Sequence, residues 1–221
     1  MIEIDKVSKK YKDVKVLEDI SFSLAEGEIH GLIGPNGSGK TTLINLITQI
    51  IFPHKGIIRG NNHNLNLGCS IGRKGFYENL SIRRNLKMIQ IIKRSADNLD
   101  FLLDFFQLTA IKSKKYRKLS EGTKQKVSIL SAFIGNPNYI LLDEPTTNLD
   151  VDAQQKLFEL ILIYQKRGTG FLISSHVLSE LEKICRKITF IKDGNIISQD
   201  SIENYHFRYQ NLENAYKEIL Q

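Results

Sequence analysis

The chain has 221 residues, of which 41% are hydrophobic, which is enough to bury the core of one domain with a subdomain. Its two cysteines, Cys69 and Cys185, lack the spacing of a metal site, so a disulfide framework or zinc site is not expected, and a reducing cytoplasm is favoured. Residues 1–6 do not have the pattern of a signal peptide, and no stretch approaches about 18 apolar residues. The net charge of +7 fits nucleic acid or an anionic membrane as a partner, and it fits an ordinary solvated surface equally well.

The N-terminal third of the chain is expected to form strands around the first helix. Ile2 and Ile4 alternate with charged residues, and residues 20–24 alternate in the same way. Residues 29–33 form a short apolar run that suits a buried strand, whereas residues 43–47 have the pattern of an amphipathic helix.

Between that strand and that helix lies the segment Gly34-Pro35-Asn36-Gly37-Ser38-Gly39-Lys40-Thr41-Thr42. Its spacing matches the phosphate-binding loop G-x-x-x-x-G-K-[ST]. Glycines let successive N–H groups point at phosphate oxygens, and the helix N-terminus adds the positive end of its dipole. We expect Lys40 to reach the β- and γ-phosphates and the Thr41 hydroxyl to ligate Mg²⁺. The whole segment is therefore predicted to bind a nucleoside triphosphate; the alternative is a glycine-rich turn that binds nothing.

The middle of the chain, from about residue 80 to 134, changes to helical periodicity. Apolar side chains recur at helical spacing over residues 82–92 and 99–106, and we interpret these stripes as helix core. Residues 119–126 then lead into another apolar-periodic helix, with Ser120 as its expected N-cap and Gly122 in its first turn. This predicts a second helix N-terminus that presents a hydroxyl group and a glycine.

From residue 138 the alternation of strand and helix returns. Residues 139–142 suit a buried parallel strand that ends at Asp143 and Glu144. Asp143 is placed to help hold Mg²⁺, and Glu144 is placed to act as a general base that orients the attacking water; the alternative is an ordinary acidic turn. The elements expected beyond them are a helix over 151–167, a strand over 170–174, a helix over 177–185, a hairpin of 187–192 with 195–198, and a partly helical tail from 202.

In this order, the motifs resemble those of the nucleotide-binding subunit of ATP-binding cassette (ABC) transporters. Residues 119–123 match the family's Leu-Ser-Gly-Gly-Gln signature at Leu, Ser and the second Gly. The resemblance implies that Tyr11 stacks on adenine, that residues 147–150 form a loop communicating across a dimer, and that His176 contacts the γ-phosphate. It also implies an α/β fold in one ABC-type domain spanning 1–221. Its parts would be a phosphate-loop NTPase core (about 1–72 and 136–221), with an N-terminal antiparallel β subdomain, and an inserted α-helical subdomain (about 73–135).

The chain departs from the family's pattern at three positions. Gly72 stands where the family has a Gln that touches Mg²⁺ and couples to the membrane subunit, at the end of residues 67–72, where the family has a loop. Glu121 replaces the first Gly of the signature, and Thr123 replaces its Gln. The combination resembles the subunits of peptide-antibiotic and lantibiotic export or immunity systems.

The resemblance implies an ATPase in which two subunits, identical or different, face head to tail. Ser120 and Gly122 of one subunit would complete the γ-phosphate site of the other, while Lys40, Glu144 and His176 would be the catalytic residues. Closure of the dimer would drive transmembrane permease subunits at the inner face of the cell membrane, with peptides, antibiotics or other amphiphiles as the cargo.

Two alternatives to a transporter subunit stay open. The first is a soluble ABC-type ATPase acting on ribosomes or nucleic acid, which a single cassette without a long coiled coil disfavours. The second, to which Gly72 points, is a nucleotide-binding regulator that hardly hydrolyses ATP.

Overall fold

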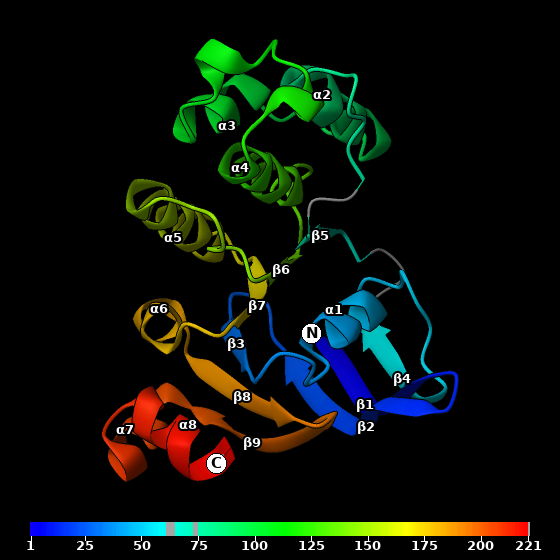
Figure 1. Cartoon of the computed structure of the whole chain (residues 1–221), viewed down its shortest axis with the longest axis vertical. Helices are drawn as coiled ribbons and strands as arrows, with labels where there is room; N and C mark the ends of the chain where they lie inside the picture. The colour runs from blue at the N-terminus through cyan, green and yellow to red at the C-terminus, as the bar shows by residue number, and fades with distance from the viewer. Residues whose placement is uncertain (61–64, 73–74, 221) are drawn as a thin grey trace.

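The computed structural model describes residues 1–60, 65–72 and 75–220, which form two sheets surrounded by helices and a helical subdomain at one end (Figure 1). The smaller sheet is antiparallel, in the order β2-β1-β4. Its strands are β1 (Ile2–Tyr11), β2 (Val14–Leu24) and β4 (Lys55–Gly60). The larger sheet has the order β5-β6-β7-β3-β8-β9, with every pair parallel except β8 and β9. Its strands are β3 (Ile29–Ile33), β5 (Leu67–Ile71), β6 (Tyr139–Asp143), β7 (Gly170–Ser175), β8 (Lys187–Lys192) and β9 (Asn195–Ser201).

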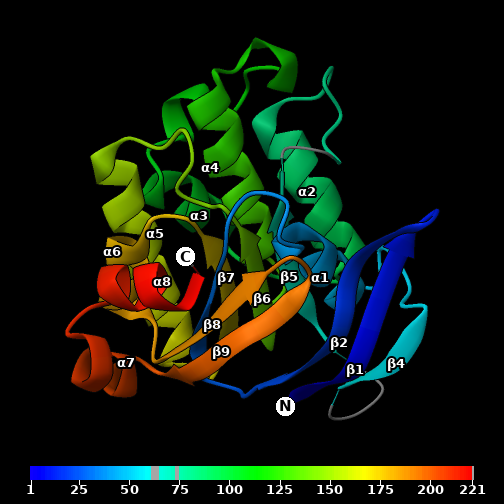
Figure 2. The same cartoon turned by 60° about the horizontal axis from the view of Figure 1, so that its bottom comes forward.

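The helices fall into two groups (Figures 1 and 2). Those around the sheets are α1 (Lys40–Ile47), α5 (Val151–Gln165), α6 (Leu178–Ile184), α7 (Ile202–Tyr209) and α8 (Leu212–Leu220). Those of the helical subdomain are α2 (Ile82–Ile92), α3 (Leu99–Phe105), α4 (Glu121–Ala132) and the short 3-10 helices η1 (Thr109–Ile111) and η2 (Tyr116–Lys118). In the part of the chain that the structure describes, no helix is both long enough and apolar enough to cross a membrane.

The central strands β3, β6 and β7 of the larger sheet bury both of their faces. In β6, Ile140 and Leu142 belong to one hydrophobic core, which includes α4 and α5, whereas Tyr139 and Leu141 belong to another, which includes α1 and β1. Successive side chains of a strand point to opposite faces, so a strand that is apolar throughout is stable only between two cores. This double burial fixes the carboxyl ends of β3, β6 and β7 side by side.

The structure confirms the predicted fold class: a phosphate-loop α/β core with an N-terminal antiparallel sheet and an inserted helical subdomain. One expectation was wrong. Residues 67–72, expected to be a loop, contain the edge strand β5, with only Gly72 beyond it. A side chain at Gly68 would place its Cβ 1.9 Å from the carbonyl oxygen of Ala132 in α4. The glycine that weakens a strand pattern is therefore needed here because a helix lies directly on the strand.

Candidate nucleotide-binding site

The phosphate-loop segment connects β3 to α1 at the carboxyl edge of the larger sheet. Gly37 and Gly39 have φ of 82° and 107°, a conformation that favours glycine. A Cβ at Gly34 would lie 2.1 Å from the carbonyl oxygen of Ile191, so the loop starts in close contact with β8. The helix α1 then begins at Lys40, with Gly39 as its N-cap and no side chain capping its first N–H groups. Those N–H groups are available to a bound anion.

Lys40 is almost fully buried beneath the loop. Its Nζ donates hydrogen bonds to the carbonyl oxygens of Gly34 (2.8 Å) and Pro35 (3.2 Å) and lies 3.8 Å from Oε1 of Glu144. A buried ammonium group needs such partners because desolvation penalises its charge. The lysine is thereby held with its charge at the centre of the loop.

Ser38 gives an independent sign that the loop is shaped for a ligand. Its side chain is only 2% exposed, and its Oγ has no hydrogen-bond partner among the described residues. An unsatisfied buried hydroxyl costs free energy, about 1–3 kcal/mol, unless a ligand or water supplies the missing partner. Phosphate oxygens would supply it.

The predicted Mg²⁺ ligands, Thr41 and Asp143, lie together. The Thr41 hydroxyl donates to Oδ2 of Asp143 (2.7 Å), and the Ser174 hydroxyl donates to Oδ1 of the same carboxylate (2.6 Å). Ser174 also accepts a hydrogen bond from the backbone N–H of Glu144 (2.9 Å). One serine at the end of β7 therefore orients both acidic residues at the end of β6.

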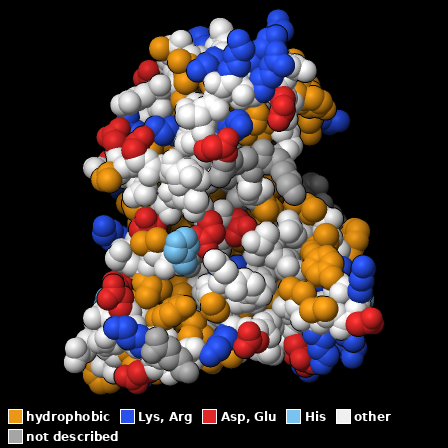
Figure 3. Space-filling model, in the orientation of Figure 1, with side chains coloured by type: hydrophobic (Ala, Val, Ile, Leu, Met, Phe, Trp, Pro, Cys, Tyr) orange, Lys and Arg blue, Asp and Glu red, His pale blue; other side chains and the backbone are white. Residues whose placement is uncertain are grey.

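Glu144 connects the phosphate loop to the predicted switch histidine. Its Oε2 lies 2.6 Å from Nδ1 of His176, while Oε1 faces Lys40. Its φ of 47° is unusual for a residue with a side chain, and such strain is kept where the surrounding structure enforces it. Figure 3 shows a histidine beside acidic side chains at the waist between the sheets and the helical subdomain.

These side chains surround a cavity of about 330 Å³. Tyr11, which ends β1, lies at this cavity with its side chain 47% exposed, as a stacking platform requires. The lining residues are Tyr11, Val16, Asn36, Gly37, Gly39, Lys40, Thr41, Thr42, Asp143 and Glu144. The structure therefore brings Tyr11, the phosphate loop and both acidic residues into one site, with His176 joined to it through Glu144.

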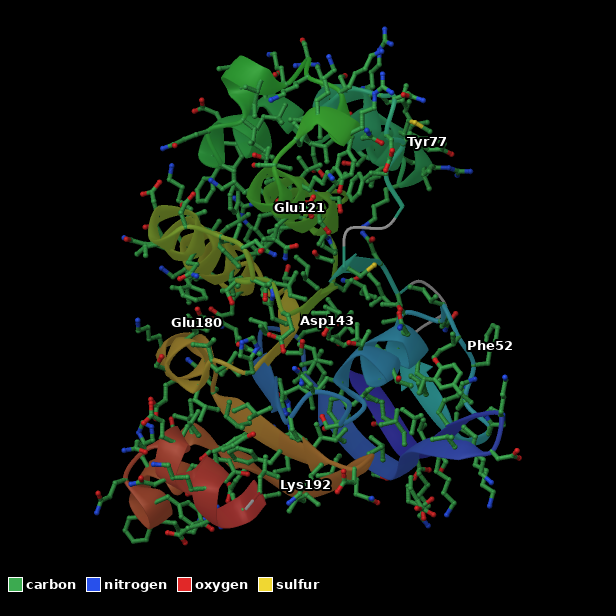
Figure 4. The ribbon with its side chains drawn as sticks, viewed as in Figure 1. Phe52, Tyr77, Glu121, Asp143, Glu180 and Lys192 are labelled. Atoms are coloured by element: carbon green, nitrogen blue, oxygen red, sulfur yellow. The ribbon has the colours of Figure 1, made fainter. Side chains whose placement is uncertain are left out.

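The signature residues lie at the start of α4. Ser120 caps that helix as predicted: its Oγ accepts from the backbone N–H of Thr123 (3.3 Å) and lies 2.8 Å from the Thr123 hydroxyl. A Cβ at Gly122 would lie 2.5 Å from the carbonyl oxygen of Asn148, so glycine permits the close approach of residues 147–150. Neither Ser120 nor Gly122 lines the cavity of their own chain. Glu121, labelled in Figure 4, belongs to the helical subdomain, and Asp143 belongs to the sheet across the waist.

A larger cleft of about 720 Å³ lies between the sheet and the helical subdomain. Its lining is mostly apolar and includes Ile50, Ile71, Gly72, Phe76, Ile89 and Lys93. Phe52 and Tyr77, which are 72% and 60% exposed, lie on the same side of the molecule in Figure 4, one on each lobe. Gly72 is exposed, and apart from its chain neighbours no atom of the described residues lies within 4 Å of the position that its Cβ would take.

The role of Ser174 was not predicted from the sequence. The pair Ser174-Ser175 at the end of an apolar run was available as a signal, because hydroxyl groups at the carboxyl end of a buried strand need polar partners. The parallel pairing of β6 with β7, which sets Asp143 opposite Ser174, identifies the partner.

The comparisons with known proteins agree with this geometry. The family model described as ABC transporter matches residues 17–147. The bacitracin transport ATP-binding protein BcrA of Enterococcus faecalis is 32% identical over 94% of this chain and 71% of that protein. The lantibiotic transport ATP-binding protein SrtF of Streptococcus pyogenes is 31% identical over 96% of each chain.

A solved structure of an ATP-binding subunit of an ABC transporter superposes with a TM-score of 0.91 and 27% identity, covering 100% of both chains. The match to the family model covers more than half of the chain, and the relatives match over almost its whole length. The chain belongs to the ABC transporter family, as an ATP-binding and ATP-hydrolysing subunit.

Proposed function

We propose that the chain binds ATP in the 330 Å³ cavity and hydrolyses it in a head-to-tail dimer that powers a membrane exporter. The proposal rests on one observation: five predicted site residues lie together. Glu144 contacts both Lys40 and His176, and the Thr41 hydroxyl donates to Asp143. Tyr11 would stack on the adenine, and residues 34–42 would hold the phosphates. The backbone N–H groups of the loop would complement the negative charge of the triphosphate.

The site also fits Mg²⁺. Thr41 and Asp143 offer a hydroxyl and a carboxylate oxygen already 2.7 Å apart, which are the hard oxygen ligands that this ion prefers. Over residues 1–60, 65–72 and 75–220, no cluster of three or more His, Cys, Asp and Glu could hold a metal. The ion would therefore come with the triphosphate, its remaining ligands being phosphate oxygens and water, and when bound it would neutralise charge on the phosphates.

Hydrolysis would depend on the two oxygens of Glu144. The one near His176 stays at the exposed side of the site, where it can accept a proton from the attacking water. Lys40 would leave the loop carbonyls to stabilise the charge that develops on the β- and γ-phosphates. His176, whose side chain is 62% exposed, would hold both Glu144 and a γ-phosphate oxygen in place.

The open side of the cavity supports a shared site. Ser120 and Gly122 lie outside the cavity of their own chain, so the α4 N-terminus of a second subunit would close it. Because one chain carries both halves, a second copy can supply the missing one; a different ATP-binding subunit could do the same.

The apolar cleft beside Gly72 is the surface we assign to the permease. The transport relatives support a membrane partner, and the mostly apolar cleft, with exposed Phe52 and Tyr77 on the same side of the molecule, suits an apolar helix of that partner. The subunit would then sit at the cytoplasmic face of the membrane. The names of BcrA and SrtF support bacitracin-like peptides or lantibiotics as the cargo class. A soluble ATPase acting on ribosomes or nucleic acid is not favoured.

Replacing the general base tests this function. Glu144→Gln keeps the shape of the side chain but removes the proton acceptor, so ATP should bind and not turn over, leaving a stable dimer. We expect size-exclusion chromatography with light scattering to show a dimer with Mg-ATP and a monomer with Mg-ADP. Glu203→Gln, on exposed α7, is the control and should hydrolyse ATP normally. A Glu144→Gln variant that stays monomeric in saturating Mg-ATP would contradict the proposal.

A further inference from the structure

Helix α4 lies in direct backbone contact with the edge strand β5. Gly68 makes this possible, because the carbonyl oxygen of Ala132 occupies the space of its missing side chain, 1.9 Å from the position of a Cβ. The two elements are therefore close enough for the short side chain of a serine to bridge them. Two serines do so at the end of the strand nearest the nucleotide site.

Ser70 in β5 and Ser128 in α4 are each 2% exposed, and their hydroxyl oxygens lie 2.8 Å apart. Ser128 also donates to the carbonyl oxygen of Gly72 (2.9 Å). A carbonyl oxygen can only accept, and a serine has one hydroxyl hydrogen. Ser128 therefore donates its hydrogen to the Gly72 carbonyl and accepts a hydrogen bond from Ser70. The three groups thus form a directed chain from Ser70 through Ser128 to the Gly72 carbonyl.

The chain of hydrogen bonds joins the two halves of the proposed ATP site. At one end, Ile71 pairs with Asp143 in the parallel ladder, which ties the end of β5 to the acidic residues. At the other end, Ser128 is on the helix whose N-terminus is Ser120, about two turns away. Gly72 has no side chain with which to make this connection, so its carbonyl serves instead.

We propose that Ser128 is a positioning residue that fixes the signature end of α4 relative to Asp143. The inference rests on the proposed dimer, because the position of α4 relative to the sheet decides whether its N-terminus can contact the nucleotide of a second subunit. Without the Ser128 hydroxyl, the carbonyl oxygen of Gly72 loses its hydrogen bond to α4, and the helix can shift slightly relative to the end of β5. ATP binding by one chain would be unchanged, whereas closure of two chains around ATP would weaken.

Other contacts keep the subdomain attached when this hydroxyl is removed. Lys93 donates to the carbonyl oxygens of Leu67 (3.0 Å) and Ile134 (2.9 Å), and Gln125 donates to that of Pro145 (3.0 Å). Ser128→Ala is therefore expected to fold. Ser131→Ala, on the same helix, is the control, because among the described residues the Ser131 hydroxyl donates within α4, to the carbonyl oxygen of Ser128 (2.6 Å).

The test measures dimerisation and nucleotide affinity separately, in the full chain carrying Glu144→Gln. With saturating Mg-ATP, sedimentation velocity should show the dimer dissociation constant raised about five- to tenfold by Ser128→Ala, the effect of losing one buried hydrogen bond. It should be unchanged by Ser131→Ala. Titration of a fluorescent ATP analogue at protein concentrations that keep the chain monomeric should give the same affinity in all variants. Ser70→Ala should have an intermediate effect, because it leaves the bond to Gly72 in place.

Each outcome decides between the claims. Equal dimerisation of Ser128→Ala and Ser131→Ala would overturn the role of Ser128 while leaving the dimer intact. A loss of nucleotide affinity in Ser128→Ala, matching its loss of dimerisation, would show an indirect effect on the binding site and would overturn it too. If the Glu144→Gln parent itself does not dimerise, the proposed function fails, and this inference fails with it.

Discussion

The proposed function assigns phosphate binding to two helix N-termini of this chain, and they are built differently. At α1 the cap is Gly39, no side chain occupies the first N–H groups, and the first turn has no acidic residue. At α4 the Ser120 hydroxyl already accepts from the N–H of Thr123, and Glu121 in the first turn is paired with Lys124 at 2.9 Å. An uncapped N-terminus has free N–H groups that can bind an anion, whereas at a capped one a side chain already accepts a hydrogen bond from an N–H group of the first turn. Under the proposed function, the first N-terminus would therefore bind the nucleotide of its own chain, and the second would meet a nucleotide held by another subunit.

The largest effect is expected from the α1 terminus. Lys40→Met keeps the length of the side chain but removes the charge that faces the phosphates, so ATP hydrolysis should fall by about 100-fold or more. Binding of a fluorescent ATP analogue should weaken in parallel. Lys183→Met, on the exposed side of α6, is the control and should retain activity. Turnover within threefold of the unmodified chain would show that the phosphate loop does not need this charge.

A smaller effect is expected at Ser174, which supports the same end of the site from β7. Ser174→Ala removes a donor to Asp143 and an acceptor for the N–H of Glu144, and steady-state turnover should fall about tenfold. Ser175→Ala is the control, because Ser175 is as buried as Ser174 and, among the described residues, its hydroxyl accepts from the N–H of Val177, 2.9 Å away, and does not contact Asp143 or Glu144. Both variants should lose similar thermal stability. Equal turnover in the two would mean that Ser174 only stabilises the fold.

The smallest effect is expected away from both termini, at Glu28 beneath the sheet. Burial alone would raise the pKa of Glu28. Its contact with His30, 3.2 Å away, and the charge of Lys187 outweigh burial, so that the pKa of Glu28 lies below its usual range. A carboxyl group with a lowered folded-state pKa contributes stability above its unfolded pKa and loses it as pH falls through the folded pKa. Denaturant unfolding should therefore show that Glu28→Gln loses less free energy of unfolding than the unmodified chain between pH 6 and pH 3.5. We expect the difference to be less than about 1 kcal/mol.

Glu203→Gln, on exposed α7, is the control for this measurement. A pH dependence as steep in Glu28→Gln as in the unmodified chain would contradict the assignment. ATP hydrolysis at pH 7 should not change in either variant, since neither residue touches the cavity.

The sequence predicted the parts of the site that depend on local spacing. The phosphate loop, Asp143, Glu144 and the Ser120 cap each lie within one turn or one strand end, so the order of residues determines their geometry. Contacts between distant segments were not predictable in this way. Ser174 meets Asp143 only through the pairing of β6 with β7, and β5 is a strand because it pairs with β6 beneath α4.

The sequence pattern also underestimated the length of the strands β1 and β2 in the smaller sheet. Residues 20–24 were expected as a strand, yet β2 starts at Val14, and β1 runs on to Tyr11. The pairing of β1 with β2 is interrupted by register shifts between Ile4 and Val7, between Val7 and Lys9, and between Lys9 and Lys10, so the added residues do not follow a regular alternation. Those shifts change which side chains face the core, so a search of the sequence for strict alternation of apolar and polar residues does not detect these parts of the strands.

The sharing of one ATP site by two chains can be tested by mixing two inactive variants. Lys40→Met disables the α1 terminus, and Ser120→Arg blocks the α4 terminus with a bulky side chain at an exposed position. In a head-to-tail dimer of one copy of each, one site combines both defects and the other combines an intact Lys40 with an intact Ser120. We predict that an equimolar mixture hydrolyses ATP well above the mean of the two separate variants. A mixture no more active than that mean would contradict a site built from two copies of this chain.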